Sequence, residues 1–148
     1  MKISSPAFKN GSVIPTVYTC DGGDVIPPLK LDEIPEGAAS LDIICQDPDS
    51  PSGDFVHWVI FDIDPSTTEI KEGEVPAGAV QGTNDFGNNN YGGPCPGSGS
   101  HRYVFKFYAL NTKLGLTTQT TKDEFRGALK NHILAEAEVM GTYQRESS

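Results

Sequence analysis

Apolar and polar positions alternate in three stretches of the chain, and this period of two predicts β-strands. Residues 40–46 ("SLDIICQ") and 101–110 ("HRYVFKFYAL") each present one apolar face. Residues 55–63 ("FVHWVIFDI") are apolar on both faces, which is typical of a central strand covered on both sides. Weaker strands are expected near "VIPTVYT" (13–19) and "GTYQR" (141–145).

One segment has a helical pattern. Thr121 followed by Glu124 is a capping box, the usual start of a helix. Gly141 is a typical helix stop. Between them, four apolar residues lie close to one helical stripe: Phe125, Leu129, Ile133 and Met140. The pattern predicts a helix from about residue 122 to residue 140, packed on the face or end of a sheet.

A long irregular region, residues 82–100, separates the second and third predicted strands. Twelve of its nineteen residues are Gly, Asn or Pro, so neither a helix nor a strand is expected there. A structureless loop of this length inside a compact domain is usually functional. We therefore expect the stretch "GGPCPGSGSHRY" (92–103) to be a close-fitting loop that positions His101.

Composition fits a single folded domain over residues 1–148. The chain has 148 residues and 36% hydrophobic residues, enough for a core without metals or disulfides. Its 16 Gly and 11 Pro indicate many turns between short strands. The predicted fold class is mostly β, with one or two peripheral helices.

Charge and hydropathy exclude several classes of protein. A net charge of −9 without a cluster of Lys and Arg argues against a nucleic-acid partner. The longest apolar run, "VHWVIF" (56–61), is too short for a transmembrane segment. The start, "MKISSPAFKNG", lacks the apolar stretch of a signal peptide. These features lead us to expect a soluble, cytoplasmic protein.

Candidate functional residues lie near the ends of the predicted strands. Asp47 and Asp49 follow the first predicted strand on a turn stiffened by prolines, and His57 lies in the apolar second strand. His101 opens the third strand, with Tyr103 on the same face. An imidazole beside a carboxylate is held in one orientation and can donate its other N–H to an anion. If these residues converge, they suit a small phosphate or carboxylate group.

Arg102 and the cysteines outside the long loop are expected to have structural roles. Arg102 points away from His101 in a regular strand, so we expect it to form a salt bridge with an aspartate. Cys20 and Cys45 are expected to be buried thiols, since three cysteines without CxxC spacing indicate neither a zinc site nor a disulfide framework. Cys95 differs because its loop is expected to be functional.

Several motifs together resemble the phosphatidylethanolamine-binding protein family, also called Raf kinase inhibitor proteins, and in particular its short bacterial and archaeal branch. They are "YTCDG" (18–22), "DPDSP" (47–51), "HW" (57–58), "YGGPCP" (91–96), "HRYVF" (101–105) and "NHILAEAEVMGTYQR" (131–145). The resemblance covers almost the whole chain in the right order and spacing.

The resemblance implies an antiparallel β-sandwich with a small anion pocket at one end, which binds groups such as a lipid phosphate. Carried over by position, the pocket comprises Asp47, Asp49, His57, Gly93, Pro94, His101 and Tyr103, with Cys95 at its rim. It also implies a regulator or inhibitor of a protein partner, such as a serine protease or a kinase. No common enzymatic activity, cofactor or metal is implied.

The chain departs from the family pattern in three places. Gly97 stands where the bacterial branch commonly has a proline, which is expected to loosen the loop before His101. "FDIDP" (61–65) replaces an asparagine-bearing stretch, and Asn131 stands where a glycine often occurs. His132 next to it is expected to be structural.

An enzyme remains as the alternative. Asp47, Asp49, His57 and His101 could hold a metal for phosphoester hydrolysis, or Cys95 could be a nucleophile with His101 as its base. The chain has no HExxH motif, no third group to orient a Cys/His pair and no recognisable oxyanion device.

Overall fold

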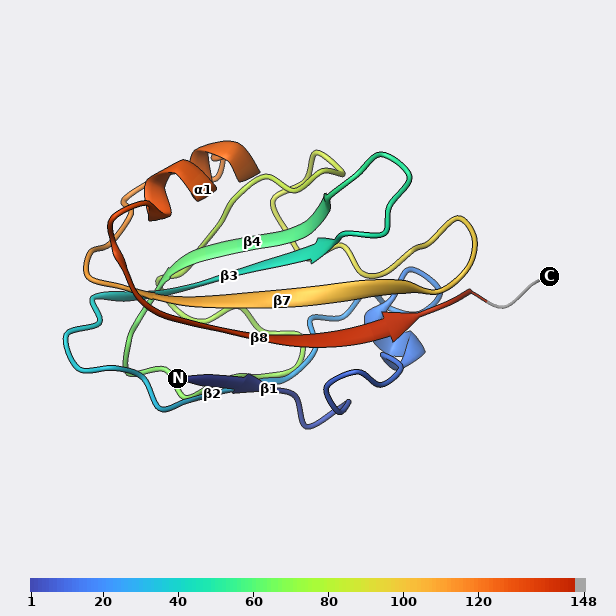
Figure 1. Ribbon diagram of the computed structural model, residues 1–148, viewed down its shortest axis with the longest axis horizontal. Helices are drawn as coiled ribbons and strands as arrows, with labels where there is room; N and C mark the ends of the chain where they lie inside the picture. The colour runs from blue at the N-terminus through green and yellow to red at the C-terminus, as the bar shows by residue number, and fades with distance from the viewer. Residues whose placement is uncertain (146–148) are drawn as a thin grey trace.

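A computed structural model describes residues 1–145, which form two antiparallel sheets and one α-helix (Figure 1). The smaller sheet has the strand order β1 (Lys2–Ser4), β2 (Leu29–Asp32) and β5 (Glu69–Ile70). The larger sheet has the order β6 (Val80–Gln81), β4 (Phe55–Ile63), β3 (Ser40–Asp47), β7 (His101–Leu110) and β8 (Ile133–Tyr143). The helices are η1 (Thr16–Tyr18) and α1 (Lys122–Leu129).

The three main predicted strands are confirmed as β3, β4 and β7, the centre of the larger sheet. β3 lies between β4 and β7 and is antiparallel to both. β4 is buried along almost its whole length, as its two apolar faces predicted. The mostly-β fold class and the two-sheet architecture are therefore confirmed.

The prediction of a helix from about residue 122 to residue 140 is wrong in its second half. The capping box is confirmed, since Thr121 Oγ1 accepts from the backbone N–H of Glu124. The helix nevertheless ends at Leu129, and Asn131 adopts a left-handed φ of 68°, which asparagine tolerates better than most residues. The chain then turns back as β8, which pairs with β7 over the length of that strand.

The expected weak strand near residues 13–19 is also largely wrong. Val13 makes a single parallel bridge to Thr142, and residues 16–18 form the 3₁₀ helix η1. The expected strand at 141–145 is the end of β8, which continues to Tyr143.

The main hydrophobic core lies between the two sheets. Side chains of the smaller sheet pack against the inner face of the larger one, and all of the following are buried: Ile3, Leu29, Leu31, Ile70, Leu41, Ile43, Trp58, Ile60, Phe105 and Phe107. A second cluster covers the outer face of the larger sheet, where α1 contributes Phe125 and Leu129. Figure 1 shows α1 above β4, with the smaller sheet on the opposite side. Burial on both faces fixes the register of the central strands.

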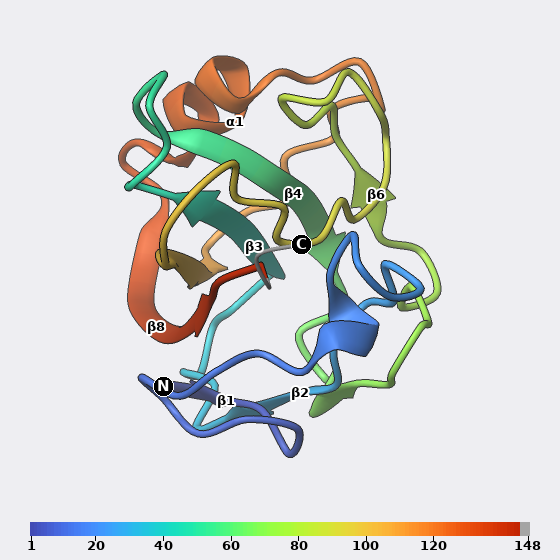
Figure 2. The same ribbon diagram turned by 90° about the vertical axis from the view of Figure 1, so that its right-hand side faces the viewer.

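One end of this sandwich collects the loops that carry the candidate residues. The turn from β3 to β4, the loop that leads into β7, and η1 all lie at the right-hand end of Figure 1. Figure 2 looks onto this end and shows η1 beside the loop that precedes β7. Segments far apart in sequence are therefore neighbours here. Within residues 1–145, no helix has the length and apolar character needed to cross a bilayer.

A buried acid lies at the opposite end of β3. Asp42 is fully buried, and its carboxylate accepts from the backbone N–H of Asp62 at 3.0 Å and from Ser40 Oγ at 3.3 Å. Burial raises the pKa of Asp42 to about 7, far above its usual value, because desolvation disfavours the charged form.

Asp42 is expected to make folding depend on pH. The folded state holds this proton more tightly than the unfolded state, so stability should fall as the pH rises from about 4 to about 7 and then level off. Asp42→Asn keeps an oxygen acceptor for Asp62 and removes the titration. Urea unfolding across this pH range should show a smaller loss of stability in the variant. An unchanged pH dependence in Asp42→Asn would contradict this assignment.

Candidate functional site

A buried ion pair joins the end of β3 to the start of β7. Asp47 is the last residue of β3 and His101 is the first of β7, and antiparallel pairing brings these ends together. His101 Nδ1 donates to Asp47 Oδ2 at 2.7 Å, and His101 Nε2 donates to the carbonyl oxygen of Ser98 at 3.1 Å. Both partners are acceptors only, so the two bonds coexist only when both ring nitrogens carry hydrogens.

Asp49 forms a second ion pair outside the cavity. Arg102 donates to its carboxylate from Nε at 3.0 Å, from Nη2 at 2.8 Å and from the backbone N–H at 2.9 Å. The hydrogen bonds from Arg102 lower the pKa of Asp49 to about 2. The predicted Arg102 salt bridge is confirmed, and it uses a carboxylate that was expected in the pocket wall.

A small cavity of about 140 Å³ opens beside the Asp47–His101 pair. Its wall combines polar residues from three strands with the loops between them: Asp47, Ser50, Pro51, Phe55, His57, Phe86, Cys95, Pro96, Gly97, His101 and Tyr103. The structure thus brings together Asp47, His57, His101 and Tyr103. The volume is below the range of about 300–1,000 Å³ for drug-sized ligands, so only a compact group fits.

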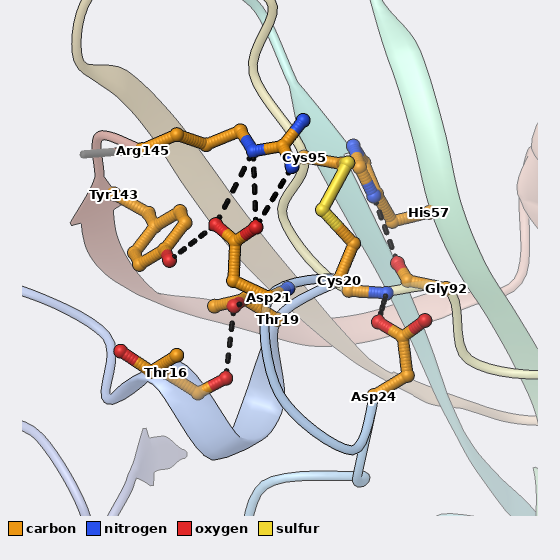
Figure 3. The surroundings of a disulfide bond; sticks show 11 residues. Thr16, Thr19, Cys20, Asp21, Asp24, His57, Gly92, Cys95, Tyr143 and Arg145 are labelled. Carbon is orange, nitrogen blue, oxygen red and sulfur yellow. Dashed lines mark hydrogen bonds and ion pairs between the residues drawn. A yellow bond between two sulfur atoms is a disulfide. The ribbon is translucent and has the colours of Figure 1, made fainter. Parts of the chain in front are cut away.

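His57 is held in one orientation by the backbone of the long loop. Its Nδ1 donates to the carbonyl oxygen of Gly92 at 2.8 Å, as Figure 3 shows. Burial lowers the pKa of His57, because the charged ring would lose its water. With Nδ1 carrying the hydrogen of the neutral ring, Nε2 is an acceptor. No residue in the described part of the chain makes a hydrogen bond with Nε2.

Tyr103 has a buried hydroxyl group without a hydrogen-bond partner among the described residues. The residue is fully buried, and nothing within residues 1–145 makes a hydrogen bond with its hydroxyl. Its ring lies edge-on to His57, with 5.2 Å between ring centroids. Burial raises its pKa, so the hydroxyl keeps its hydrogen. A buried hydroxyl without a partner is costly and normally has an explanation.

Two aromatic side chains in the wall were missed by the sequence analysis. Phe55 and Phe86 both contact His57 edge-on, at 5.1 and 5.2 Å between centroids, and contact each other at 4.9 Å. Phe55 could have been found, because it shares a strand face with His57. Phe86 sits alone among Asn and Gly and remains 44% exposed, so no local pattern indicates its place.

Gly93 and Pro94, expected in the pocket, lie behind its wall. The N–H of Gly93 donates to Asp24 Oδ1 at 2.9 Å, and the N–H of Cys20 donates to the carbonyl oxygen of Pro94 at 3.1 Å. A Cβ on residue 93 would lie 2.3 Å from the carbonyl oxygen of Tyr18. Glycine is therefore required for this close approach. Gly97, by contrast, lines the cavity and has open space around it.

Cys20 and Cys95 are not free thiols but form a disulfide, which corrects our expectation (Figure 3). The bond joins residues 75 apart in sequence and fastens the loop after η1 to the loop before β7. Spacing alone could not reveal it, because the two cysteines meet only in the folded chain. Cys45 is free and buried, as expected. Cys95 contributes to the cavity wall as half of a disulfide.

The loop after η1 is also fastened to the end of β8. Asp21 accepts from Tyr143 Oη at 2.7 Å and from Arg145 Nη2 at 2.8 Å (Figure 3). These two bonds lower the pKa of Asp21, with the larger effect from Tyr143. The disulfide and this cluster together tie three distant segments at this end of the molecule.

Metal binding finds no support in the arrangement of side chains. Among residues 1–145 there is no group of three His, Cys, Asp or Glu placed to hold a metal ion. Asp49, one of the four expected ligands, is turned to Arg102. His132, as expected for a structural residue, lies elsewhere and its Nδ1 bonds to Asn111 Oδ1.

Comparison with known proteins gives a consistent result across nearly the whole chain. The family model described as phosphatidylethanolamine-binding protein matches residues 4–144. A UPF0098 protein of Methanothermobacter thermautotrophicus is 46% identical, with 98% of this chain and 99% of the relative covered. A UPF0098 protein of Chlamydia muridarum is 40% identical over 99% of this chain and 100% of the relative.

Solved structures agree with this result. The crystal structure of a phosphatidylethanolamine-binding protein homolog from Chlamydia trachomatis superimposes with a TM-score of 0.94 at 38% identity, covering 98% of this chain and 97% of the other. Escherichia coli YbcL, described as a member of the mammalian PEBP family, gives 0.92 at 30% identity, with 98% of each chain covered. The chain therefore belongs to the phosphatidylethanolamine-binding protein family.

Proposed function

We propose that the cavity binds a small anionic group, such as the phosphate of a lipid headgroup or of a free phosphoester. The observation that carries this proposal is the buried Tyr103 hydroxyl, which has no partner within residues 1–145 and belongs to the cavity wall. An anion oxygen in the cavity would accept from it. The family description and the small volume support a compact phosphate-bearing ligand.

The expected site residues divide into two groups under this proposal. Asp47, His57, His101 and Tyr103 line the cavity and define the space for the ligand. Asp49, Gly93 and Pro94 lie outside the cavity wall. Their hydrogen bonds and close packing hold the surrounding loops in place. Cys95 and its disulfide form part of the wall.

Binding without catalysis is the function that these contacts favour. The sulfur of Cys95 is bonded to Cys20, so it is not a thiolate nucleophile in this state. His101 is engaged at both nitrogens and is not placed to accept a proton from a substrate. The cysteine-dependent hydrolase would need both groups to be free.

We extend the proposal to a protein partner, such as a serine protease or a kinase, that responds to the occupied pocket. A larger groove of about 1050 Å³ shares Pro96 and Gly97 with the cavity wall, so a ligand can change its shape. Inhibition assays on a panel of serine proteases and kinases, with and without phosphoethanolamine, test this extension. Absence of inhibition at about micromolar protein, the range of a modest complex, would argue against it.

We also propose that the protein is cytoplasmic. The Cys20–Cys95 disulfide restricts this proposal, because disulfides persist in oxidising compartments and in the cytoplasm of hyperthermophiles. Trapping the cysteines with an alkylating agent in intact cells would report their state. A bond reduced in cells would fit an ordinary reducing cytoplasm.

Tyr103→Phe tests the central observation. The change removes a buried hydroxyl that has no protein partner within residues 1–145, so the variant should be more stable by about 1 kcal/mol. It should also bind phosphoethanolamine about tenfold more weakly, because it loses a hydrogen bond to a charged group. Thermal unfolding and calorimetry measure the two effects.

Tyr108→Phe is the matched control, since this tyrosine lies on the same strand but outside the cavity. It should leave phosphoethanolamine binding unchanged. Wild-type affinity in Tyr103→Phe would contradict the proposed role of the hydroxyl.

A further inference from the structure

We infer that the pocket selects anions that carry their own proton, namely phosphomonoesters in the monoanionic form, over anions of equal charge that have none. This inference rests on the proposed function and concerns its specificity. It follows from which atoms of the wall donate and which accept.

His57 presents an acceptor to the cavity, not a donor. The carbonyl oxygen of Gly92 can only accept, so the hydrogen of the neutral ring must be on Nδ1, 2.8 Å away. Nε2 then carries a lone pair. An anion oxygen without a hydrogen would place its own lone pairs against it.

The groups around His57 do not supply a spare proton. Asp47 at the end of β3 and Asp85 in the loop after β6 both favour a charged ring, but burial opposes it more strongly. Both carboxylates are already engaged, Asp47 by His101 and Asp85 by Lys122 Nζ at 2.7 Å. Tyr103 on β7 faces the ring edge-on and keeps its hydrogen.

The surrounding charges are matched in pairs. The positive ring of His101 faces Asp47 at 2.7 Å, and Arg102 faces Asp49 at 2.8 Å. Neither cation is left to attract an anion by charge alone. Recognition must therefore depend on the hydrogen-bond pattern, in which Tyr103 offers a donor and His57 offers an acceptor.

A monoanionic phosphomonoester fits this pattern. Its P–OH group can donate to His57 Nε2, while one of its unprotonated oxygens accepts from the Tyr103 hydroxyl. The second pKa of a phosphomonoester is about 6, so this form is common in mildly acidic solution and rare at higher pH. Phosphodiesters, which include the phosphates of most lipid headgroups, have no such hydrogen at neutral pH, so of the two phosphate sources in the proposed function the free phosphomonoester is favoured. Sulfate esters and carboxylates also lack it. Bound in the cavity, these anions would cover Nε2 and leave it without a partner, which is costly.

A matched pair of ligands tests the inference on the unaltered protein. Phosphoethanolamine and 2-aminoethyl sulfate have the same shape, and near pH 6 their acidic groups carry similar charge. Only the first has an acidic hydrogen on its anionic group. Calorimetry should give at least about tenfold tighter binding of the phosphoester at about pH 6, the effect of one lost hydrogen bond to a charged group.

Raising the pH should remove this preference. Between about pH 6 and about pH 7.5 the monoanion fraction falls roughly 15-fold, and phosphoethanolamine affinity should fall with it. The weak binding of the sulfate ester should change little. The ³¹P shift of bound phosphoethanolamine at about pH 7 should remain that of the protonated form.

The other outcomes are equally informative. Equal affinity for the two esters at about pH 6 would overturn the inference and leave the anion pocket intact, since an acceptor at His57 would then not matter. A bound phosphoester with the ³¹P shift of the dianion would also overturn it, because the proton would lie on the ring. Failure of both ligands to bind would refute the proposed function itself.

Discussion

The candidate site depends on the buried contact between Asp47 and His101. It joins the last residue of β3 to the first residue of β7, at 2.7 Å, where the two central strands meet the loops. The same ring reaches back to Ser98 and holds the loop that forms one side of the cavity. Sheet pairing alone brings the two strand ends together, but this ion pair fixes how the loop closes over them.

Other polar groups at this end of the molecule are also hydrogen-bonded to one another. Arg102 donates to Asp49, and His57 donates to the carbonyl oxygen of Gly92. The N–H of Gly93 donates to Asp24. Within residues 1–145, the Tyr103 hydroxyl and the His57 Nε2 lone pair are the wall groups without a protein partner on which we expect a ligand to depend. Recognition then depends on hydrogen-bond direction more than on charge.

The sequence predicted well what depends on local periodicity and on residue type. The bounds of β4 and β7 and the Arg102 ion pair followed from alternation along the strands. The end of α1 was missed because Ile133 and Met140 continue the helical stripe and Gly141 is a typical helix stop, and only pairing with β7 makes this segment a strand. Asn131, noted as a departure from the family pattern, marks the left-handed turn between the two.

The rest of the site depends on contacts between distant segments, which no local pattern carries. The disulfide joins loops from opposite halves of the chain, and Phe86 reaches His57 from an otherwise polar loop. Gly93 was placed in the pocket by its motif, but its tight contact is with the backbone of Tyr18. Motif position indicated the loop that lines the cavity without showing which of its residues face that cavity.

Side-chain ¹⁵N–¹H correlation spectra of the three histidines in the free protein, at about neutral pH, test this account most directly. We expect hydrogens on both ring nitrogens of His101 and on Nδ1 alone of His57. A His101 ring with a single hydrogen, or a His57 ring protonated at Nε2, would contradict it.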